Sequence, residues 1–319
     1  MNDVMLSVCV LSYNHERYLR QCLDGIFMQK VSFPIEVRVH DDASTDKSQD
    51  IIREYQERHP NILKPILQSE NQYSKGGGVL AKFLLPLCEG KYIALCEGDD
   101  YWTDPLKLQK QVDYMEAHDK CSCCAHNSLR LNTNTRQIGL FNKKILQTKD
   151  YSLETFITRD WFTPTQSLLY RRASYQTFED MLAFMHGDYS LLINVLLTSG
   201  SYLHYENEIM AVYRDGGFAS THYKECDLYN DFVLLLEFYK QKSNHRCDAV
   251  FDRQIERQKL EKERYLKYQK DYKKTHSLLV RVGHWVCRAI ASVVNKYVPC
   301  IHVTKKLEFE AVPNLEQID

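Results

Sequence analysis

Acidic side chains gather in one short segment, and their spacing indicates the first chemistry in this sequence. The segment 96–105 reads CEGDDYWTDP and follows the apolar run 92–95 directly. Carboxylates that converge at the end of a strand repel one another, so a cation or a ligand donor is expected among them. Oxygen-rich sites of this kind suit Mg²⁺ or Mn²⁺, which stay partly hydrated and bridge to the phosphates of a substrate. The four acids are Glu97, Asp99, Asp100 and Asp104, of which Asp104, directly before Pro105, is most simply a helix cap.

Polar residues also follow two earlier strand-like runs. The run 6–11 (LSVCVL) ends at Ser12-Tyr13-Asn14, and the run 35–40 (IEVRVH) ends at Asp41-Asp42. Any one of these residues is explained by its suitability for turns. Two adjacent acidic pairs at the ends of parallel strands are harder to explain in that way, because ligands of open α/β sheets collect at the carboxyl ends of the strands. We therefore predict one crevice lined by all three clusters.

Strand-like and helical segments alternate along the first third of the chain. Such alternation predicts parallel βαβ units with helices on both faces of the sheet, which is an α/β fold. Predicted strands cover 6–11, 35–40, 64–68, 91–96, 121–131, 165–170 and 202–213, and predicted helices cover 17–29, 47–58, 79–88, 105–118 and 189–198.

Composition argues against several classes of partner and compartment. The 319 residues include 41 basic and 42 acidic side chains, and this balance argues against nucleic acid as the main partner. No apolar run reaches about 18 residues, and the first residues do not resemble a signal peptide, so we expect a cytoplasmic protein. The odd count of 11 cysteines fits reduced thiols. The cluster Cys121, Cys123, Cys124 and His126 lacks a second pair at zinc-finger spacing and is interpreted as small buried side chains.

The sequence changes character near residue 223 and becomes predominantly helical. Densely charged residues over 253–274 predict a solvated helix. The segment 278–298 has apolar residues at helical spacing, interspersed with cations and Trp285. Two interpretations stay open for it, a helix docked on the protein or an interfacial helix at the inner face of the cytoplasmic membrane.

Three motifs in this order resemble those of family 2 glycosyltransferases with the GT-A fold. The motifs lie at 7–14, 41–46 and 97–100, and the resemblance covers roughly residues 5–220. It implies a Rossmann-like, mainly parallel sheet flanked by helices, with a C-terminal helical extension. The implied organisation is a nucleotide-sugar-binding half (1–125), an acceptor-binding half (126–222) and the helical extension (223–319).

The resemblance also implies roles for individual donor-site residues. Glu97 stands where the family usually has Asp, Asp99 aligns with the metal-binding position, and Asp100 follows it as in many relatives. His222 lies where some GT-A enzymes place a late histidine on the metal. Residues implied to contact the base or ribose of a nucleotide-sugar are Ser12, Tyr13, Asn14, Asp41 and Asp42.

Three further positions carry predictions about the donor site. Lys82, after the glycine run 76–78, is a candidate phosphate contact, although the spacing of a phosphate-binding P-loop is absent. Arg214, in YRDGG, is interpreted either as a diphosphate contact or as the partner of an acid in the core. Ala43 replaces the usual Gly of the second motif, which predicts a turn without a positive φ there.

Asp188 completes the predicted chemistry. In HGDYSLL it opens an apolar helix, where the resemblance implies the general base and where an N-cap role is equally compatible with its position. The resulting hypothesis is an inverting glycosyltransferase that uses Mn²⁺ or Mg²⁺ and a nucleotide-sugar, with UDP as the default nucleotide by family frequency. We expect the acceptor to be a saccharide or lipid-linked saccharide of bacterial surface polysaccharide or glycolipid synthesis.

Two other functions remain as alternatives. One is another metal-dependent phosphoryl or nucleotidyl transfer, against which the absence of a phosphate-cradling motif counts. The other is a non-catalytic module that binds a nucleotide-sugar, against which the intact carboxylates at all three strand ends count.

Overall fold

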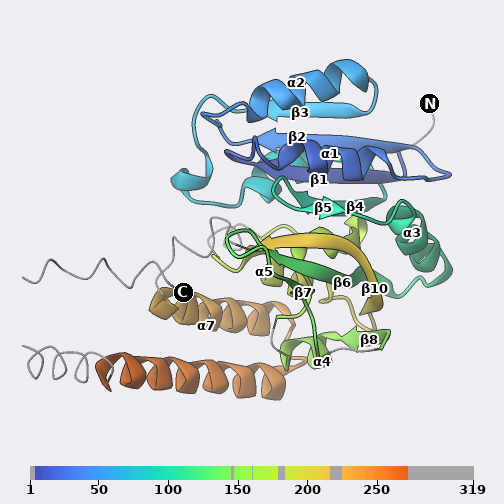
Figure 1. Cartoon of the computed structure of the whole chain (residues 1–319). Helices are drawn as coiled ribbons and strands as arrows, with labels where there is room; N and C mark the ends of the chain where they lie inside the picture. The colour runs from blue at the N-terminus through green and yellow to red at the C-terminus, as the bar shows by residue number, and fades with distance from the viewer. Residues whose placement is uncertain (1–3, 145–146, 160, 179–183, 216–224, 272–319) are drawn as a thin grey trace, which may run out of the picture. The chain divides into compact units, whose positions relative to one another are not determined.

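The computed structural model of the chain describes residues 4–144, 147–159, 161–178, 184–215 and 225–271 (Figure 1). The chain divides into one compact unit, Met1–Leu260, and a second, Glu261–Asp319. His222 and the segment 278–298 lie outside the described residues, so their predicted roles stay predictions. Within the described part, no helix is long and apolar enough to cross a membrane.

A single mixed sheet runs through the first unit, with strand order β3-β2-β1-β4-β9-β6-β10-β5 and with β7 and β8 paired to β6 and β10. Strands β1 to β4 pair in parallel, as do β6 and β10, whereas β9 lies antiparallel to both β4 and β6. The predicted α/β class with a mainly parallel sheet is confirmed. The strands are β1 Leu6–Ser12, β2 Ile35–Asp41, β3 Leu63–Leu67, β4 Tyr92–Glu97, β5 Tyr101–Trp102, β6 Cys121–Asn132, β7 Ile138–Leu140, β8 Lys149–Ser152, β9 Leu169–Arg171 and β10 Tyr202–Asp215.

Both faces of the sheet are buried, which explains why its central strands are continuously apolar. Along β1, Val8 and Val10 belong to a core shared with α1, α2 and α3, whereas Cys9 belongs to a core shared with α4, α5 and α7. The thiols of Cys121, Cys123 and Cys124 are fully buried in these two cores, as their interpretation predicted. Among the described residues, the α-helices are α1 Leu19–Phe27, α2 Ser48–Arg58, α3 Lys107–Ala117, α4 Leu153–Ile157, α5 Gly187–Val195 and α7 Glu225–Lys242, and a further helix covers 248–271.

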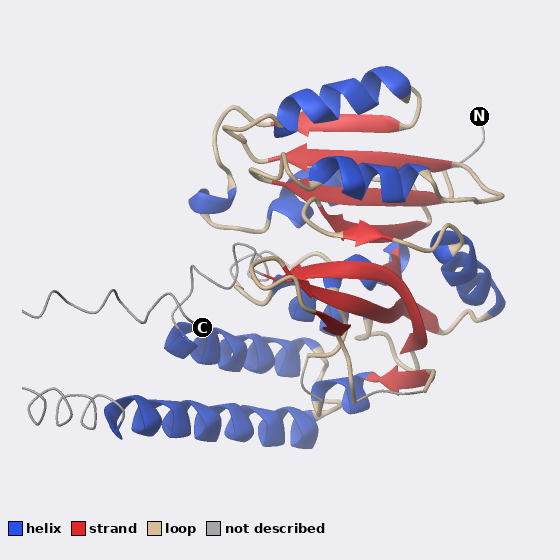
Figure 2. Ribbon diagram, in the orientation of Figure 1, coloured by secondary structure: helices blue, strands red, loops and turns tan. Residues whose placement is uncertain are grey.

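Two long neighbouring strands, β6 and β10, curve together through the second half of the sheet (Figure 2). Their pairing shifts register three times, between Tyr202 and Leu203, between Glu206 and Ile209, and between Ile209 and Val212. Irregularities of this kind bend a strand and increase its twist. Beyond them, the N–H of Arg214 on β10 donates to Asp100 Oδ1 at 2.7 Å, so this end of β10 meets the acidic segment that follows β4.

Two element predictions were wrong for a shared reason, the placement of proline. The helix predicted over 79–88 is instead a π-helical turn, Leu80–Leu84, followed by a 3-10 turn, Leu85–Leu87. Pro86 cannot donate to a continuing helix and clashes with the preceding turn. The strand predicted over 165–170 begins only at Leu169, because a 3-10 turn follows Pro164.

The prediction for Ala43 was also wrong, since its φ is +62°. Hydrogen bonds on either side hold this left-handed conformation. Asp41 Oδ1 accepts from the Ser44 N–H at 2.9 Å, and the N–H of Asp42 donates to the Ser12 carbonyl at 2.9 Å. These local bonds offset the steric cost that a side chain has at positive φ.

Gly25 is expected to be required for packing helix α1 against β5. A Cβ on this residue would lie 2.8 Å from the carbonyl oxygen of Trp102 and 3.0 Å from its nitrogen. Although alanine favours helices by about 1 kcal/mol over glycine, Gly25→Ala should lower the free energy of unfolding by about 1–3 kcal/mol through overpacking. Urea unfolding measures this change. Gly187→Ala is the control, because a Cβ there meets nothing within 4 Å; equal stability of the two variants would contradict the packing argument.

Candidate functional site

Three carboxylates converge where β4 ends. Glu97, Asp99 and Asp100 each offer an oxygen, and these oxygens lie within 4.8 Å of one another. The turn that gathers them is fixed by the Gly98 N–H, which donates to the Leu11 carbonyl at 2.8 Å. A Cβ on Gly98 would lie 2.8 Å from His15 Nδ1 and 3.1 Å from the Leu11 carbonyl oxygen, so a larger residue here would displace the His15 ring. The predicted acidic cluster therefore exists as a compact set of oxygen donors.

The electrostatics of this cluster favour the binding of a cation. Burial raises the pKa of Glu97 to about 8, and the negative charges of Asp99 and Asp188 add to the effect. Burial likewise raises the pKa of Asp100, with Asp99 and Glu97 as the next causes. The Nε2 atom of the neighbouring His15 lies 3.9 Å from Asp99 Oδ2. Burial lowers the pKa of His15, which favours the neutral imidazole. Oxygen donors with this unbalanced charge suit a hard divalent ion.

Arg214 holds the acidic segment in place. In addition to its backbone bond to Asp100, its guanidinium donates to the carbonyl oxygen of Asp99 and to Gln21 Oε1. The guanidinium carbon also lies over two aromatic rings, 4.6 Å from the centre of Tyr18 and 4.5 Å from that of Tyr101. These guanidinium contacts are thus with neutral oxygens and rings, and together with the backbone bond to Asp100 they give Arg214 a positioning role within the cluster. A contact between Arg214 and a diphosphate stays a prediction.

The loops after β1 and β2 are tied together by the residues predicted to contact a base or ribose. Asn14 accepts from the Thr45 N–H at 2.8 Å, and its own N–H donates to Ser44 Oγ at 2.8 Å. The carboxylate of Asp41 accepts hydrogen bonds from Ser44 in the same loop and from Gln49 in the first turn of α2. The structure therefore gives Asn14 and Asp41 a role in shaping the crevice.

The remaining predicted donor-site residues differ in whether their side chains already form hydrogen bonds within the protein. Asp42 accepts from the backbone N–H groups of Gln72 and Tyr73, at 2.7 and 2.9 Å, and so anchors the segment after β3. The buried hydroxyl of Ser12 has no hydrogen-bond partner among the described residues, and Tyr13 is 37% exposed. Lys82 Nζ donates to the carbonyl oxygen of Gly77, within the glycine run 76–78, at 2.8 Å.

Asp188 lies in the first turn of α5, close enough to the acidic cluster for its charge to act on Glu97. Its Oδ1 accepts from the Tyr189 N–H at 2.8 Å, and its Oδ2 accepts from Thr165 Oγ1 at 3.2 Å. Burial raises the pKa of Asp188 despite these two bonds. The charge of Asp188 in turn raises the pKa of Glu97, which reflects their proximity. A buried carboxylate with a raised pKa, next to a cluster of oxygen donors, is typical of a catalytic base.

The helical extension fixes the segment that enters α5. Asp231 on α7 accepts from the Met185 N–H at 3.0 Å and from His186 Nδ1 at 2.8 Å. The Tyr239 hydroxyl on α7 also lies 2.9 Å from Ser190 Oγ on α5. The position of Asp188 therefore depends on contacts with the part of the chain predicted to be a separate extension.

Sequence reasoning missed two residues that contact the acidic cluster. His15 directly follows the first motif, but it belongs to no sequence pattern that would have indicated a role. Gln166 comes from a distant segment; with its amide nitrogen turned toward Asp100, it donates to Oδ2 at 3.1 Å, and its oxygen accepts from the Tyr213 N–H at 3.3 Å. A motif search along the chain has no signal for a contact such as this, because the sheet brings the two residues together.

Comparison with known proteins decides the family. The model of Glycosyl transferase family 2 matches residues 7–189, which include all three motifs and Asp188. The chain belongs to glycosyl transferase family 2. An uncharacterized protein of Mycobacterium tuberculosis, Rv1520, is 39% identical over 212 residues, which are 66% of this chain and 58% of the relative. This chain thus spans less than two thirds of that relative's length.

Solved structures support the fold of this family 2 member. Staphylococcus aureus TarS 1–349 in complex with UDP-GlcNAc aligns with a TM-score of 0.57 and 21% identity, over 73% of this chain and 66% of TarS. The mannosyltransferase PcManGT of Pyrobaculum calidifontis, in complex with GDP-Man and Mn²⁺, aligns with a TM-score of 0.51 and 15% identity, over 94% of this chain and 85% of PcManGT. The predicted GT-A fold is confirmed.

Binding of Mn²⁺ to the acidic cluster is expected to release protons at neutral pH. Glu97, with a pKa of about 8, carries a proton at pH 7 that the ion would displace, so Mn²⁺ affinity should rise with pH. Calorimetry at pH 7 in buffers of different ionisation enthalpy measures the proton release. Asp99→Asn should abolish the binding, whereas the exposed Asp113→Asn on α3 should leave it unchanged. Binding without proton release would contradict the electrostatic account.

Proposed function

We propose that this chain transfers a sugar from a nucleotide-sugar, with UDP as the default nucleotide, to a hydroxyl group with inversion at the anomeric carbon. The observation that supports this most directly is the proximity of Asp188 to the acidic cluster. Asp188 and the cluster of Glu97, Asp99 and Asp100 lie close enough for their charges to interact, although they come from distant parts of the chain. An inverting transfer needs a base and a diphosphate site on opposite sides of one sugar, and Asp188 and the acidic cluster would supply these two groups.

The donor would lie along the carboxyl ends of β1, β2 and β4. Ser12, Tyr13 and Asn14 would line the pocket for the base, with Asp41 and Asp42 shaping its floor. Glu97 would lie near the ribose, and Asp99 and Asp100 would hold Mn²⁺ or Mg²⁺ beside the diphosphate. The metal, when bound, supplies positive charge that stabilises the leaving nucleoside diphosphate. Mn²⁺ in the PcManGT complex and UDP-GlcNAc in the TarS complex support these choices by analogy.

Asp188 would act on the acceptor side of the sugar. Its raised pKa makes it a better proton acceptor than an ordinary aspartate, and the bond from Thr165 orients its carboxylate. We propose a saccharide or lipid-linked saccharide as the acceptor. A non-catalytic nucleotide-sugar-binding module would have the same donor residues, so the two functions differ in whether Asp188 matters for turnover.

Asp188→Asn keeps the size and much of the hydrogen bonding of the side chain but removes the base. Transfer should fall by roughly 10²–10⁴-fold, the usual contribution of a general base, while Mn²⁺-dependent binding of UDP stays unchanged. Product formation with a panel of UDP-sugars and calorimetry with UDP give the two readouts. The control is Asp248→Asn, which alters an aspartate paired with the exposed His245. Near wild-type turnover in Asp188→Asn would place the base elsewhere.

A further inference from the structure

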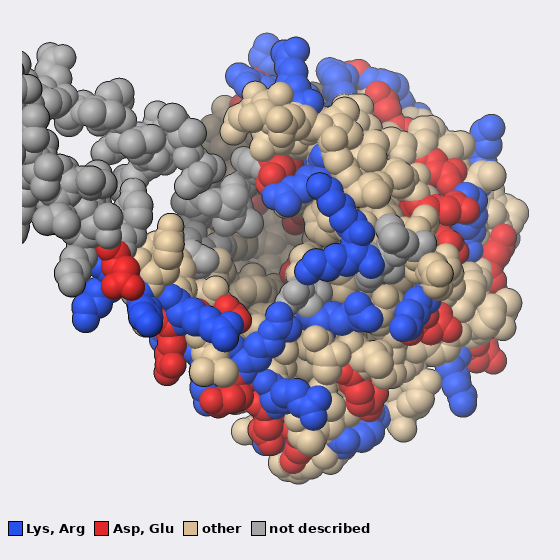
Figure 3. Space-filling model, turned by 60° about the horizontal axis from the view of Figure 1, so that its bottom comes forward, with Lys and Arg blue, Asp and Glu red and all other residues tan. Residues whose placement is uncertain are grey.

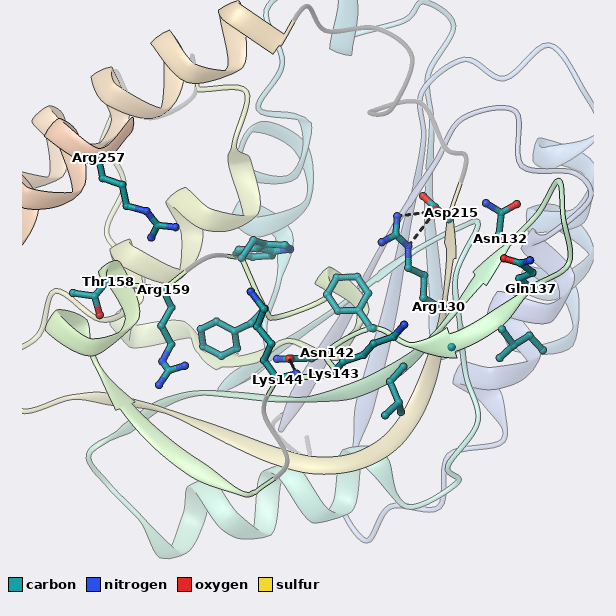
Figure 4. A pocket seen from close by; sticks show the side chains of 16 residues that line it. Arg130, Asn132, Gln137, Asn142, Lys143, Lys144, Thr158, Arg159, Asp215 and Arg257 are labelled. Carbon is teal, nitrogen blue, oxygen red and sulfur yellow. Dashed lines mark hydrogen bonds and ion pairs between the residues drawn. The ribbon is translucent and has the colours of Figure 1, made fainter. Parts of the chain in front are cut away.

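A large cavity lies in the second half of the sheet, apart from the residues assigned to the donor. Its volume is about 770 Å³, and its lining comes from the ends of β6 and β10, from β7 and the residues after it, from the segment after α4, and from the helix 248–271 (Figure 4). This volume is in the range of small-molecule sites, about 300–1,000 Å³. The cavity is therefore large enough for a sugar together with its substituents.

The lining of this cavity is strongly cationic. Among the described residues of the lining there is one acid, Asp215, and its Oδ2 lies 2.7 Å from a guanidinium nitrogen of Arg130. Figure 3 shows Lys and Arg side chains gathered around a hollow on the face turned toward the viewer. A concave site with this excess of one charge attracts ligands of the opposite charge. The cationic residues of the lining are Arg130, Lys143, Lys144, Arg159 and Arg257.

Two aromatic contacts connect the cavity with the proposed reaction centre. Phe141 of the lining packs edge-on against Tyr213, with ring centres 5.2 Å apart. Tyr213 lies near the acidic cluster, since burial and then the charges of that cluster raise the pKa of its hydroxyl. Trp161 of the lining packs against Tyr189, the residue after Asp188, at 5.8 Å. Two lining residues thus contact Tyr213, which lies near the acidic cluster, and Tyr189, which follows Asp188.

We propose that this cavity, termed the basic pocket, binds the phosphate groups of a phosphate-linked sugar acceptor. This proposal rests on the proposed function, because it assigns the pocket to the acceptor of the same transfer. Arginine binds phosphate through paired hydrogen bonds, and several cations around one cavity match the charge of a phosphate or diphosphate better than that of a single carboxylate. Trp161 and Phe141 provide apolar surface for the attached sugar or for the first part of a lipid carrier.

The test separates the basic pocket from the donor site by working without divalent metal. In EDTA, α-D-glucose 1-phosphate should bind to the wild-type protein and glucose should not. The double variant Lys143→Gln/Arg159→Gln should weaken this binding at least about tenfold, because it removes two charge-assisted contacts. Lys30→Gln/Lys120→Gln, which removes the same charge from two exposed positions, should not. Unfolding midpoints of both variants show whether the fold is kept.

A second comparison identifies the source of the phosphate. Tighter binding of farnesyl diphosphate than of inorganic pyrophosphate would support a lipid-linked acceptor, and equal binding would support a soluble sugar phosphate. Equal affinity of wild type and Lys143→Gln/Arg159→Gln for all of these probes would overturn the proposal. Binding to phosphatidylglycerol vesicles that requires Lys143 and Arg159, without binding of any of these probes, would also overturn it and assign the surface to a membrane.

Failure of the two proposals can be distinguished. Mn²⁺-dependent UDP binding should be unchanged in Lys143→Gln/Arg159→Gln, because neither residue lies in the acidic cluster. Loss of phosphate binding with intact UDP binding in the variant is the expected pattern. Absence of UDP binding in the wild-type protein would count against the proposed function alone.

Discussion

The repulsion among Glu97, Asp99 and Asp100 is the constraint around which the site is organised. Their oxygens lie within 4.8 Å of one another, and burial adds to the cost of their charges. A folded chain keeps such a cluster only if other groups hold it in place. Arg214 does this through its backbone bond to Asp100 and its guanidinium bond to the carbonyl of Asp99. These two contacts engage one oxygen of the Asp100 carboxylate and the backbone carbonyl of Asp99. They therefore leave the cluster with charge that can bind a metal.

Two other parts of the fold, β10 and α7, connect this cluster with the basic pocket and with Asp188. The bent strand β10 carries Arg214 toward the end of β4 and continues to Asp215 at the rim of the basic pocket. Helix α7 fixes the entry to α5 through Asp231, and so fixes the position of Asp188. The helical extension therefore contributes to the proposed catalytic geometry, in addition to covering the core. This dependence explains why contacts far along the chain matter for a site whose motifs lie in the first 100 residues.

The sequence was most informative where one local pattern determines the structure. The buried runs of β1, β2 and β4 and the acids that follow them were predictable, because hydrophobic periodicity and strand ends are local features. Ala43 was mispredicted, since its positive φ is stabilised by the bond that Asp41 accepts from Ser44 and the bond that Asp42 donates to Ser12. The contacts of Gln166 and the basic pocket were not predictable, because they join segments that only the sheet brings together.

Anomalous diffraction from a crystal of the protein grown with Mn²⁺ and UDP would test the central claim most directly. The account predicts one strong manganese peak at about 2.0–2.2 Å from a carboxylate oxygen of Asp99, with the UDP diphosphate on the same ion. UDP bound with manganese absent from the cluster, or manganese bound only at other acids, would contradict it.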